Sequence, residues 1–116
     1  MGSLKSGVHI NAIGSFTPSM QEIDEEIIVK ADKICVDSLD ATLKEAGDII
    51  IPINKGLITK KDIYCEIGKM INGEKVESEN SKEIAIFKIV GISIQDIAIG
   101  MYIYKKVQKL GTGKVF

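Results

Sequence analysis

The chain has 116 residues, enough for one domain with a single modest core. Its 15 cationic and 16 acidic side chains leave a formal net charge of −1, which excludes a strongly basic protein built to neutralise nucleic-acid phosphates. All the cationic side chains are Lys. Because only Arg makes a planar, two-pronged contact with carboxylates and phosphates, the chain lacks the usual clamp for a small carboxylate substrate.

The cysteines and the single histidine predict no redox or metal chemistry. Cys35 and Cys65 lie far apart and form no CxxC pair, so we expect both to be buried structural residues. His9 lies inside an apolar strand, where a hydrogen-bonded core histidine is more common than a catalyst. No second His stands at a metal-ligand spacing, and we therefore expect no metal site.

The apolar segments are too interrupted to cross a membrane. The longest of them, residues 84–103, contains Lys88, Gln95 and Asp96. No charged segment followed by an apolar run opens the chain in the manner of a secretory signal. We expect a cytoplasmic protein that binds neither membrane nor nucleic acid.

The first elements predicted are a buried strand over residues 8–13 and a helix. Thr17 and Pro18 indicate a helix start, and Ser19 with Glu22 is an alternative capping box. Apolar residues would then recur on one helical face, at Met20, Ile23, Ile27 and Ala31.

The middle of the chain predicts a second strand over residues 33–37 and a short helix over 39–46. Gly47 would end that helix as a left-handed cap. Pro52 makes residues 48–56 an irregular or edge segment. Thr59 with Asp62 predicts a further helix that ends at residues 72–73.

The last third predicts a charged surface loop, a strand and a long helix. Residues 74–83 are polar and read as a mobile loop, while residues 84–90 form a strand that is apolar on both faces except at Lys88. Residues 93–110 form a helix whose first two-thirds are apolar nearly all round, so it requires burial on every side.

These elements predict an α/β protein: a three-layer, partial Rossmann-like fold with a short parallel sheet of about three strands flanked by helices. The whole chain, residues 1–116, would be one domain that resembles the C-terminal half of an NAD(P)-binding domain. Helix 93–110 would pack against a dimer mate or another partner.

Phosphate-binding motifs are missing or broken. The GTGK stretch at residues 111–114 continues with Val115 instead of Ser or Thr, which excludes a phosphate loop. The dinucleotide fingerprint GxGxxG is absent, so the chain lacks the turn and helix N-terminus that hold a pyrophosphate.

Four blocks of sequence, at residues 7–24, 36–58, 63–75 and 84–98, resemble the C-terminal part of the ornithine cyclodeaminase/mu-crystallin family. The resemblance covers nearly the whole chain, in order. It implies a relative of NAD(P)-dependent dimers that combine a Rossmann domain with a second domain for substrate and dimer contacts. Two stretches would be cofactor-binding: Asn11, Ala12, Ile13 and Gly14 beside the nicotinamide, and Lys88, Ile89, Val90 and Gly91 near the second domain.

Two departures from the family pattern bear on activity. The cyclodeaminases carry a catalytic Asp where this chain has Phe16, so the resemblance implies that ornithine deamination is not its reaction. Ile89 replaces the Ser of the family's FKSVG stretch, which removes a hydroxyl. No residue of this chain is assigned a catalytic role.

Three functions remain open at this point. The chain is a truncated, non-catalytic module that self-associates through helix 93–110. Alternatively, it is one subunit of a split NAD(P)-dependent ketimine reductase or amino-acid dehydrogenase, joined through that helix to a complementary N-terminal-half polypeptide. It is, thirdly, a fragment of such an enzyme. In each case we expect the isolated chain to hold no cofactor and transfer no hydride. It lacks the Gly-rich turn that would bind the cofactor and the Arg that would bind the substrate.

Overall fold

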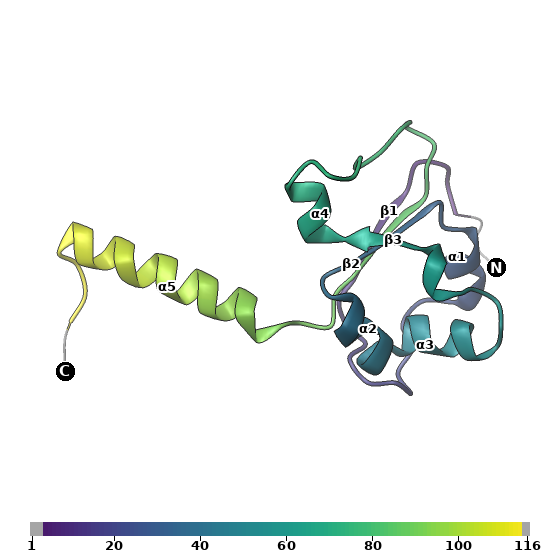
Figure 1. Ribbon diagram of the computed structural model, residues 1–116, viewed down its shortest axis with the longest axis horizontal. Helices are drawn as coiled ribbons and strands as arrows, with labels where there is room; N and C mark the ends of the chain where they lie inside the picture. The colour runs from purple at the N-terminus through teal and green to yellow at the C-terminus, as the bar shows by residue number, and fades with distance from the viewer. Residues whose placement is uncertain (1–3, 115–116) are drawn as a thin grey trace.

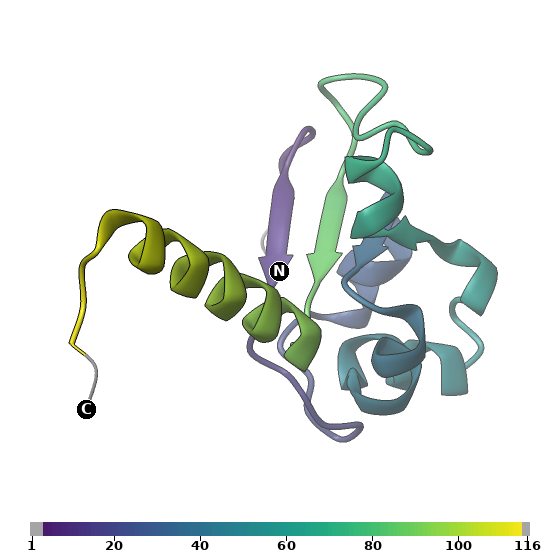
Figure 2. The same ribbon diagram turned by 60° about the vertical axis from the view of Figure 1, so that its left-hand side comes forward.

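Four parallel strands form one sheet in the computed structural model, which describes residues 4–114 (Figures 1 and 2). They are β1 (His9–Ala12), β2 (Lys33–Val36), β3 (Ile63–Glu66) and β4 (Ala85–Lys88), in the order β1-β4-β2-β3. The predicted α/β class and parallel, Rossmann-like sheet are confirmed, with four strands where about three were predicted.

Helices cover the two faces of the sheet unequally. The helices α1 (Glu25–Lys30), α2 (Leu39–Glu45) and α3 (Gly47–Asn54) pack together on the first face. The short helix α4 (Ile67–Ile71) leads from β3 back to β4. The step from β3 to β4 runs across the sheet in the opposite direction to the two earlier steps, so a right-handed crossover puts α4 on the second face.

The hydrophobic core lies between the sheet and the first-face helices. Alternation along the strands directs Ala12, Ile34 and Ile86 into this core. The other buried members are Ile23, Ile28, Val36, Ala46, Ile49, Ile58 and Ile63. Lys33, Cys35 and Phe87 point to the second face instead.

The sequence does not predict strand β3, because its residues fall inside the helix predicted from Thr59 to residues 72–73. Thr59 and Asp62 do form a capping box, but it begins a single turn of 3-10 helix, Lys60–Asp62. The chain then extends, and Ile63 and Cys65 are buried on alternate positions in the manner of a strand. Only the last part of the predicted helix exists, as α4.

The helix predicted from Thr17 or Ser19 begins later, with Asp24 as the residue before α1. The backbone N–H groups of Glu22 and Ile23 donate to Asp48 Oδ1 at 2.7 and 3.0 Å, which holds this segment as a loop. The Glu22 carboxylate accepts from Gly14 N, so it forms no capping box with Ser19.

The prediction for Gly47 and Pro52 was also wrong. Gly47 has no positive φ and is the first residue of α3; a Cβ there would collide with the carbonyl oxygens of Met20 and Pro18. Glycine is therefore required for close approach of the 17–23 loop. Pro52 lies inside α3 and is buried, because packing of this apolar helix against α1 and α2 outweighs its lost hydrogen bond.

The two cysteines are free and buried, as predicted, and face each other from β2 and β3 with 3.9 Å between the sulfur atoms. Burial, followed by the neighbouring Cys65, raises the pKa of Cys35 to about 12, which keeps the thiol protonated. His9 departs from its predicted core position: it is exposed on β1, and its ring bonds the side chain of Asn11 at 3.1 Å.

The last helix, α5 (Ser93–Leu110), has the predicted bounds but leaves the body of the protein altogether (Figure 1). None of its residues is buried. The radius of gyration is 17.3 Å, against about 13 Å for a compact chain of this length, because α5 projects. Its apolar surface therefore has no cover among residues 4–114.

Candidate functional site

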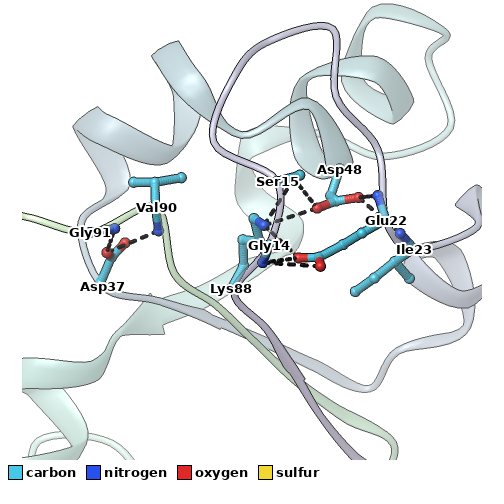
Figure 3. Close-up of polar contacts among 9 residues, drawn as sticks. All are labelled: Gly14, Ser15, Glu22, Ile23, Asp37, Asp48, Lys88, Val90 and Gly91. Atoms are coloured by element: carbon cyan, nitrogen blue, oxygen red, sulfur yellow. Dashed lines mark hydrogen bonds and ion pairs between the residues drawn. The ribbon is translucent and has the colours of Figure 1, made fainter.

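Three strands, β1, β4 and β2, end side by side at the carboxyl end of the sheet. Three segments leave from there: the loop after Ala12, the segment after Lys88 that leads to α5, and Asp37 directly after β2. In open α/β sheets this end carries the ligand sites. Figure 3 shows the polar contacts that fix these segments.

Lys88 is the centre of a buried polar network (Figure 3). Its ammonium lies 3.0 Å from Asp48 Oδ2, 3.0 Å from Glu22 Oε1 and 2.9 Å from Ser15 Oγ. Ser15 also donates to Asp48. Lys88 and Asp48 are both fully buried, so each charge is compensated by the other. The network ties the loop after β1 to the end of β4 and the start of α3.

Both carboxylates in this network are held ionised. Burial alone would raise the pKa of Asp48, but hydrogen bonds from Ser15, the backbone of Ile23 and Lys88 outweigh it and lower the pKa below its ordinary value. The pKa of Glu22 is lowered in the same way, with burial opposed by Lys88 and by the Gly14 backbone. The network is therefore a set of fixed charges at neutral pH.

Asp37 fixes the second segment. Its Oδ2 accepts from the backbone N–H groups of Val90 at 3.1 Å and Gly91 at 2.9 Å (Figure 3). Gly91 has a φ of 86°, a left-handed conformation that glycine adopts without strain. Together these features set the direction in which α5 leaves the sheet.

The predicted cofactor residues gather at this one end but differ in exposure. In the first stretch, Asn11, Ile13 and Gly14 are exposed and Ala12 is buried. In the second, Ile89 and Val90 are half-buried, Gly91 is exposed and Lys88 is buried. The Lys88 side chain is part of the buried network beneath the loop after β1. The exposed surface of the site is formed by that loop.

Four residues of this end were missed from the sequence: Ser15, Glu22, Asp37 and Asp48. A signal existed for two of them. Asp37 directly follows an apolar strand, and Asp48 precedes an apolar run, where a buried carboxylate requires a cation. Pairing Asp48 with Lys88 across 40 positions needs the fold.

Between residues 4 and 114, no group of three His, Cys, Asp or Glu side chains lies close enough to hold a metal ion. No helix in the same span is long and apolar enough to cross a membrane.

Comparison with known proteins identifies the family. The family model for the ornithine cyclodeaminase/mu-crystallin family matches residues 2–111. The chain belongs to this family. The resemblance carried by the four sequence blocks is therefore confirmed over nearly the whole chain.

Two similar family members are reductases. A Delta(1)-pyrroline-2-carboxylate reductase of Bacillus cereus is 46% identical over 110 residues, which is 95% of this chain and 34% of the bacterial protein. The mouse ketimine reductase mu-crystallin is 34% identical over 101 residues, covering 87% of this chain and 29% of the mouse protein.

The fold matches solved family structures. The Thermococcus litoralis Delta(1)-pyrroline-2-carboxylate reductase, solved in complex with NADH and L-proline, superposes with a TM-score of 0.90 at 36% identity. The match covers 97% of this chain and 35% of the archaeal one. The chain thus spans about a third of the length of these relatives.

Proposed function

We propose that this chain forms the nicotinamide-side part of an NAD(P)-dependent reductase whose substrate is a cyclic imine with a neighbouring carboxylate, of the Delta(1)-pyrroline-2-carboxylate class. The observation that carries the proposal is the exposed loop after β1, which lies at the carboxyl end of the sheet and beside an open sheet edge. The identity to such reductases supports the substrate class.

Topology supports the position of the cofactor. The crossover from β1 to β2 and the crossover from β2 to β3 both lie on the first face. A strand added on the other side of β1 would begin a run in the opposite direction, with its helices on the second face. The change of direction would then occur beside β1, and dinucleotides bind at the carboxyl end of such a switch point.

The residues present fit one side of a nicotinamide ring. Ile13 and Phe16 are 67% and 59% exposed and offer an apolar wall next to the exposed backbone at Gly14. Gly91 approaches from the neighbouring segment without a side chain. A bound nicotinamide supplies the hydride, while the Lys88 network holds the wall in place and the apolar side chains exclude water from the ring face.

The chain does not supply the residues that would bind the cofactor's pyrophosphate or the substrate's carboxylate. GxGxxG and Arg are both absent from its sequence, so the pyrophosphate and the substrate carboxylate need residues from elsewhere. Hydride transfer therefore requires a Gly-rich turn and a carboxylate-binding cation from outside these 116 residues.

The test is a reductase assay with a chimeric pair. The chain is co-expressed with the part of the Bacillus cereus reductase that precedes the matched third, and NADH and NADPH oxidation is followed with Delta(1)-pyrroline-2-carboxylate. We expect turnover by the pair and none by either polypeptide alone. A pair that assembles and binds neither cofactor nor imine would overturn the proposal.

Self-association as a non-catalytic module is the second candidate, and α5 favours it. Ile94, Ile97, Ile99, Met101 and Ile103 are all more than half exposed on this helix. A helix with such a surface is stable in water only when something covers it. A second copy of α5 would provide that cover without any cofactor.

A further inference from the structure

We propose that Cys35 and Cys65 form a reversible intramolecular disulfide when the protein meets hydrogen peroxide, and that this bond fastens the edge strand β3 to the sheet. The two are the only cysteines of the chain. The sequence predicts a purely structural role for both, and neither belongs to the proposed cofactor surface. This modification site is therefore independent of the proposed function.

The two thiols face each other from neighbouring strands (Figure 1). Cys35 on β2 and Cys65 on β3 are register partners, and their sulfur atoms lie 3.9 Å apart. Neighbouring strands lie about 4.8 Å apart, and a disulfide joins residues whose Cα atoms are about 4.4–6.8 Å apart. Strand pairing thus holds both cysteines within the range that a disulfide requires.

An irregularity in the strand pairing gives the backbone room to bring the sulfur atoms together. They must approach from 3.9 Å to about 2.05 Å. Ile34 pairs with Ile63 and Cys35 pairs with Cys65, so Tyr64 is an extra residue in β3, and such a bulge disrupts the ladder locally. Within residues 4–114, β2 is the only neighbour of β3 in the sheet. The backbone beside Cys65 can therefore shift without disturbing a strand on its other side.

Two cavities admit a small oxidant to the cysteines. Cys35 lines a cavity of about 410 Å³ on the second face, and Cys65 lines another of about 190 Å³. The two residues are only 6% and 7% exposed, which shields them from large reagents and from the thiols of other protein molecules. Hydrogen peroxide is little larger than water, which occupies about 30 Å³, so it fits either cavity.

Cys65 is the thiol that reacts first, and Cys35 completes the disulfide. Burial, followed by the neighbouring Cys65, raises the pKa of Cys35 to about 12, so Cys35 stays protonated. Its S–H has two acceptors within reach, the sulfur of Cys65 at 3.9 Å and the carbonyl oxygen of Val36 at 4.0 Å. Because the thiolate is the nucleophile, Cys65 is left to attack the peroxide.

The disulfide forms in two steps. The sulfur of Cys65 attacks one peroxide oxygen and the O–O bond breaks, which gives a sulfenic acid on Cys65 and one water that carries the thiol proton. The sulfur of Cys35 then attacks the sulfur of Cys65, the S–O bond breaks, and the Cys35 proton leaves with the hydroxyl group as a second water. The thiol pair loses two electrons, which reduce the peroxide to water. A small dithiol reverses the bond by thiol–disulfide exchange.

The first test treats the reduced chain with hydrogen peroxide, blocks the remaining thiols with N-ethylmaleimide in denaturant, and measures the intact mass. We expect a monomer that has lost two hydrogen atoms and takes up no maleimide, and dithiothreitol should restore both reactive thiols. Two free thiols after peroxide treatment, or dimers linked by a disulfide, would overturn the proposal.

Single variants test the order of the two steps. Cys35→Ser should stop at a sulfenic acid on Cys65, which dimedone traps. Cys65→Ser should give about tenfold less dimedone adduct or lower still, because the Cys35 thiol stays protonated. Circular dichroism checks that each variant is folded. Equal dimedone labelling of the two folded variants would overturn the assignment of Cys65 as the attacking thiol.

Hydrogen exchange of the parent chain tests the effect on β3 and needs no variant. Oxidation should slow amide exchange in residues 63–66 by about tenfold or more, because the disulfide opposes local opening of the edge strand. The strand β1 at the other edge of the sheet is the matched control, since it carries no cysteine, and its exchange should stay the same. A disulfide that leaves exchange in residues 63–66 unchanged would overturn the fastening of β3.

Discussion

The ammonium of Lys88 at the end of β4 lies 3.0 Å from the carboxylate of Asp48 at the start of α3, and both side chains are fully buried. This ion pair, with Ser15 and Glu22, holds the loop after β1 in place. The proposed cofactor surface therefore depends on residues beneath it that the cofactor would not touch.

Removal of the cation should be costly. In Lys88→Met, the buried carboxylate of Asp48 loses its counter-charge, and we expect a loss of about 3 kcal/mol or more in the free energy of unfolding. Urea denaturation followed by circular dichroism measures this loss. The matched control is Lys44→Met, whose i,i+4 pair with Asp40 is exposed and should leave the urea midpoint unchanged. Equal midpoints for the two variants would contradict the role of the network.

Acid should weaken the same network. The folded-state pKa of Asp48 is lowered, so its ionised form stabilises the fold above the unfolded-state value of about 3.9. That contribution is lost as the pH falls from there through the folded-state pKa, because in this range the unfolded state binds a proton that the folded state does not. The urea midpoint should fall steadily between about pH 5 and pH 2.

Asp48→Asn provides the comparison for this acid dependence. The variant should be less stable than the parent at pH 7 and should show a flatter slope of stability against pH below about pH 5. An unchanged slope would show that other carboxylates, such as Glu22, cause the acid dependence.

Much of the fold was readable from the sequence, and the failures have a physical cause. Residues 84–110 gave β4 and α5 nearly to the residue because a buried strand and a long apolar helix each have an unbroken pattern. The α3 and β3 elements failed because tertiary packing overrides local signals: burial keeps Pro52 in a helix, and pairing with β2 extends Ile63–Glu66.

The candidate site was predictable only in part. The family resemblance gave the two stretches around Gly14 and Gly91, which do meet at the carboxyl end of the sheet. The partners of Lys88 could not be read, because Ser15, Glu22 and Asp48 converge only after the chain has folded. Similarly, the direction in which α5 projects from the sheet could not be predicted from the sequence. The apolar surface of α5, which requires a covering partner, could be.

Gly91 should be sensitive to substitution because of its backbone. Gly91→Ala puts a Cβ on a residue with a φ of 86° and should destabilise the protein by about 1 kcal/mol, although nothing stands within 4 Å of that Cβ. Gly68→Ala is the matched control, since Gly68 has equally open surroundings but lies in α4. There, alanine should stabilise the helix by up to about 1 kcal/mol. Thermal denaturation should show melting temperatures that move in opposite directions.

The α5 surface makes a prediction about self-association. If a second copy covers α5, Ile97→Asp should raise the dissociation constant of the oligomer by about tenfold or more, because a charge replaces a buried apolar side chain. Sedimentation velocity over a concentration series measures this change. Lys105→Gln, farther along the same helix, should have little effect. A parent chain that is monomeric at micromolar concentration would exclude this assembly.

The central claim is the proposal that the loop after β1 forms one side of a nicotinamide site, which residues outside these 116 complete. The most direct measurement is a fluorescence titration with NADH and NADPH, up to millimolar, of the chain alone and of the chain co-purified with the N-terminal part of the Bacillus cereus reductase. The account predicts no saturable binding by the chain alone and saturable binding by the pair. Saturable binding by the chain alone, or none by an assembled pair, would contradict it.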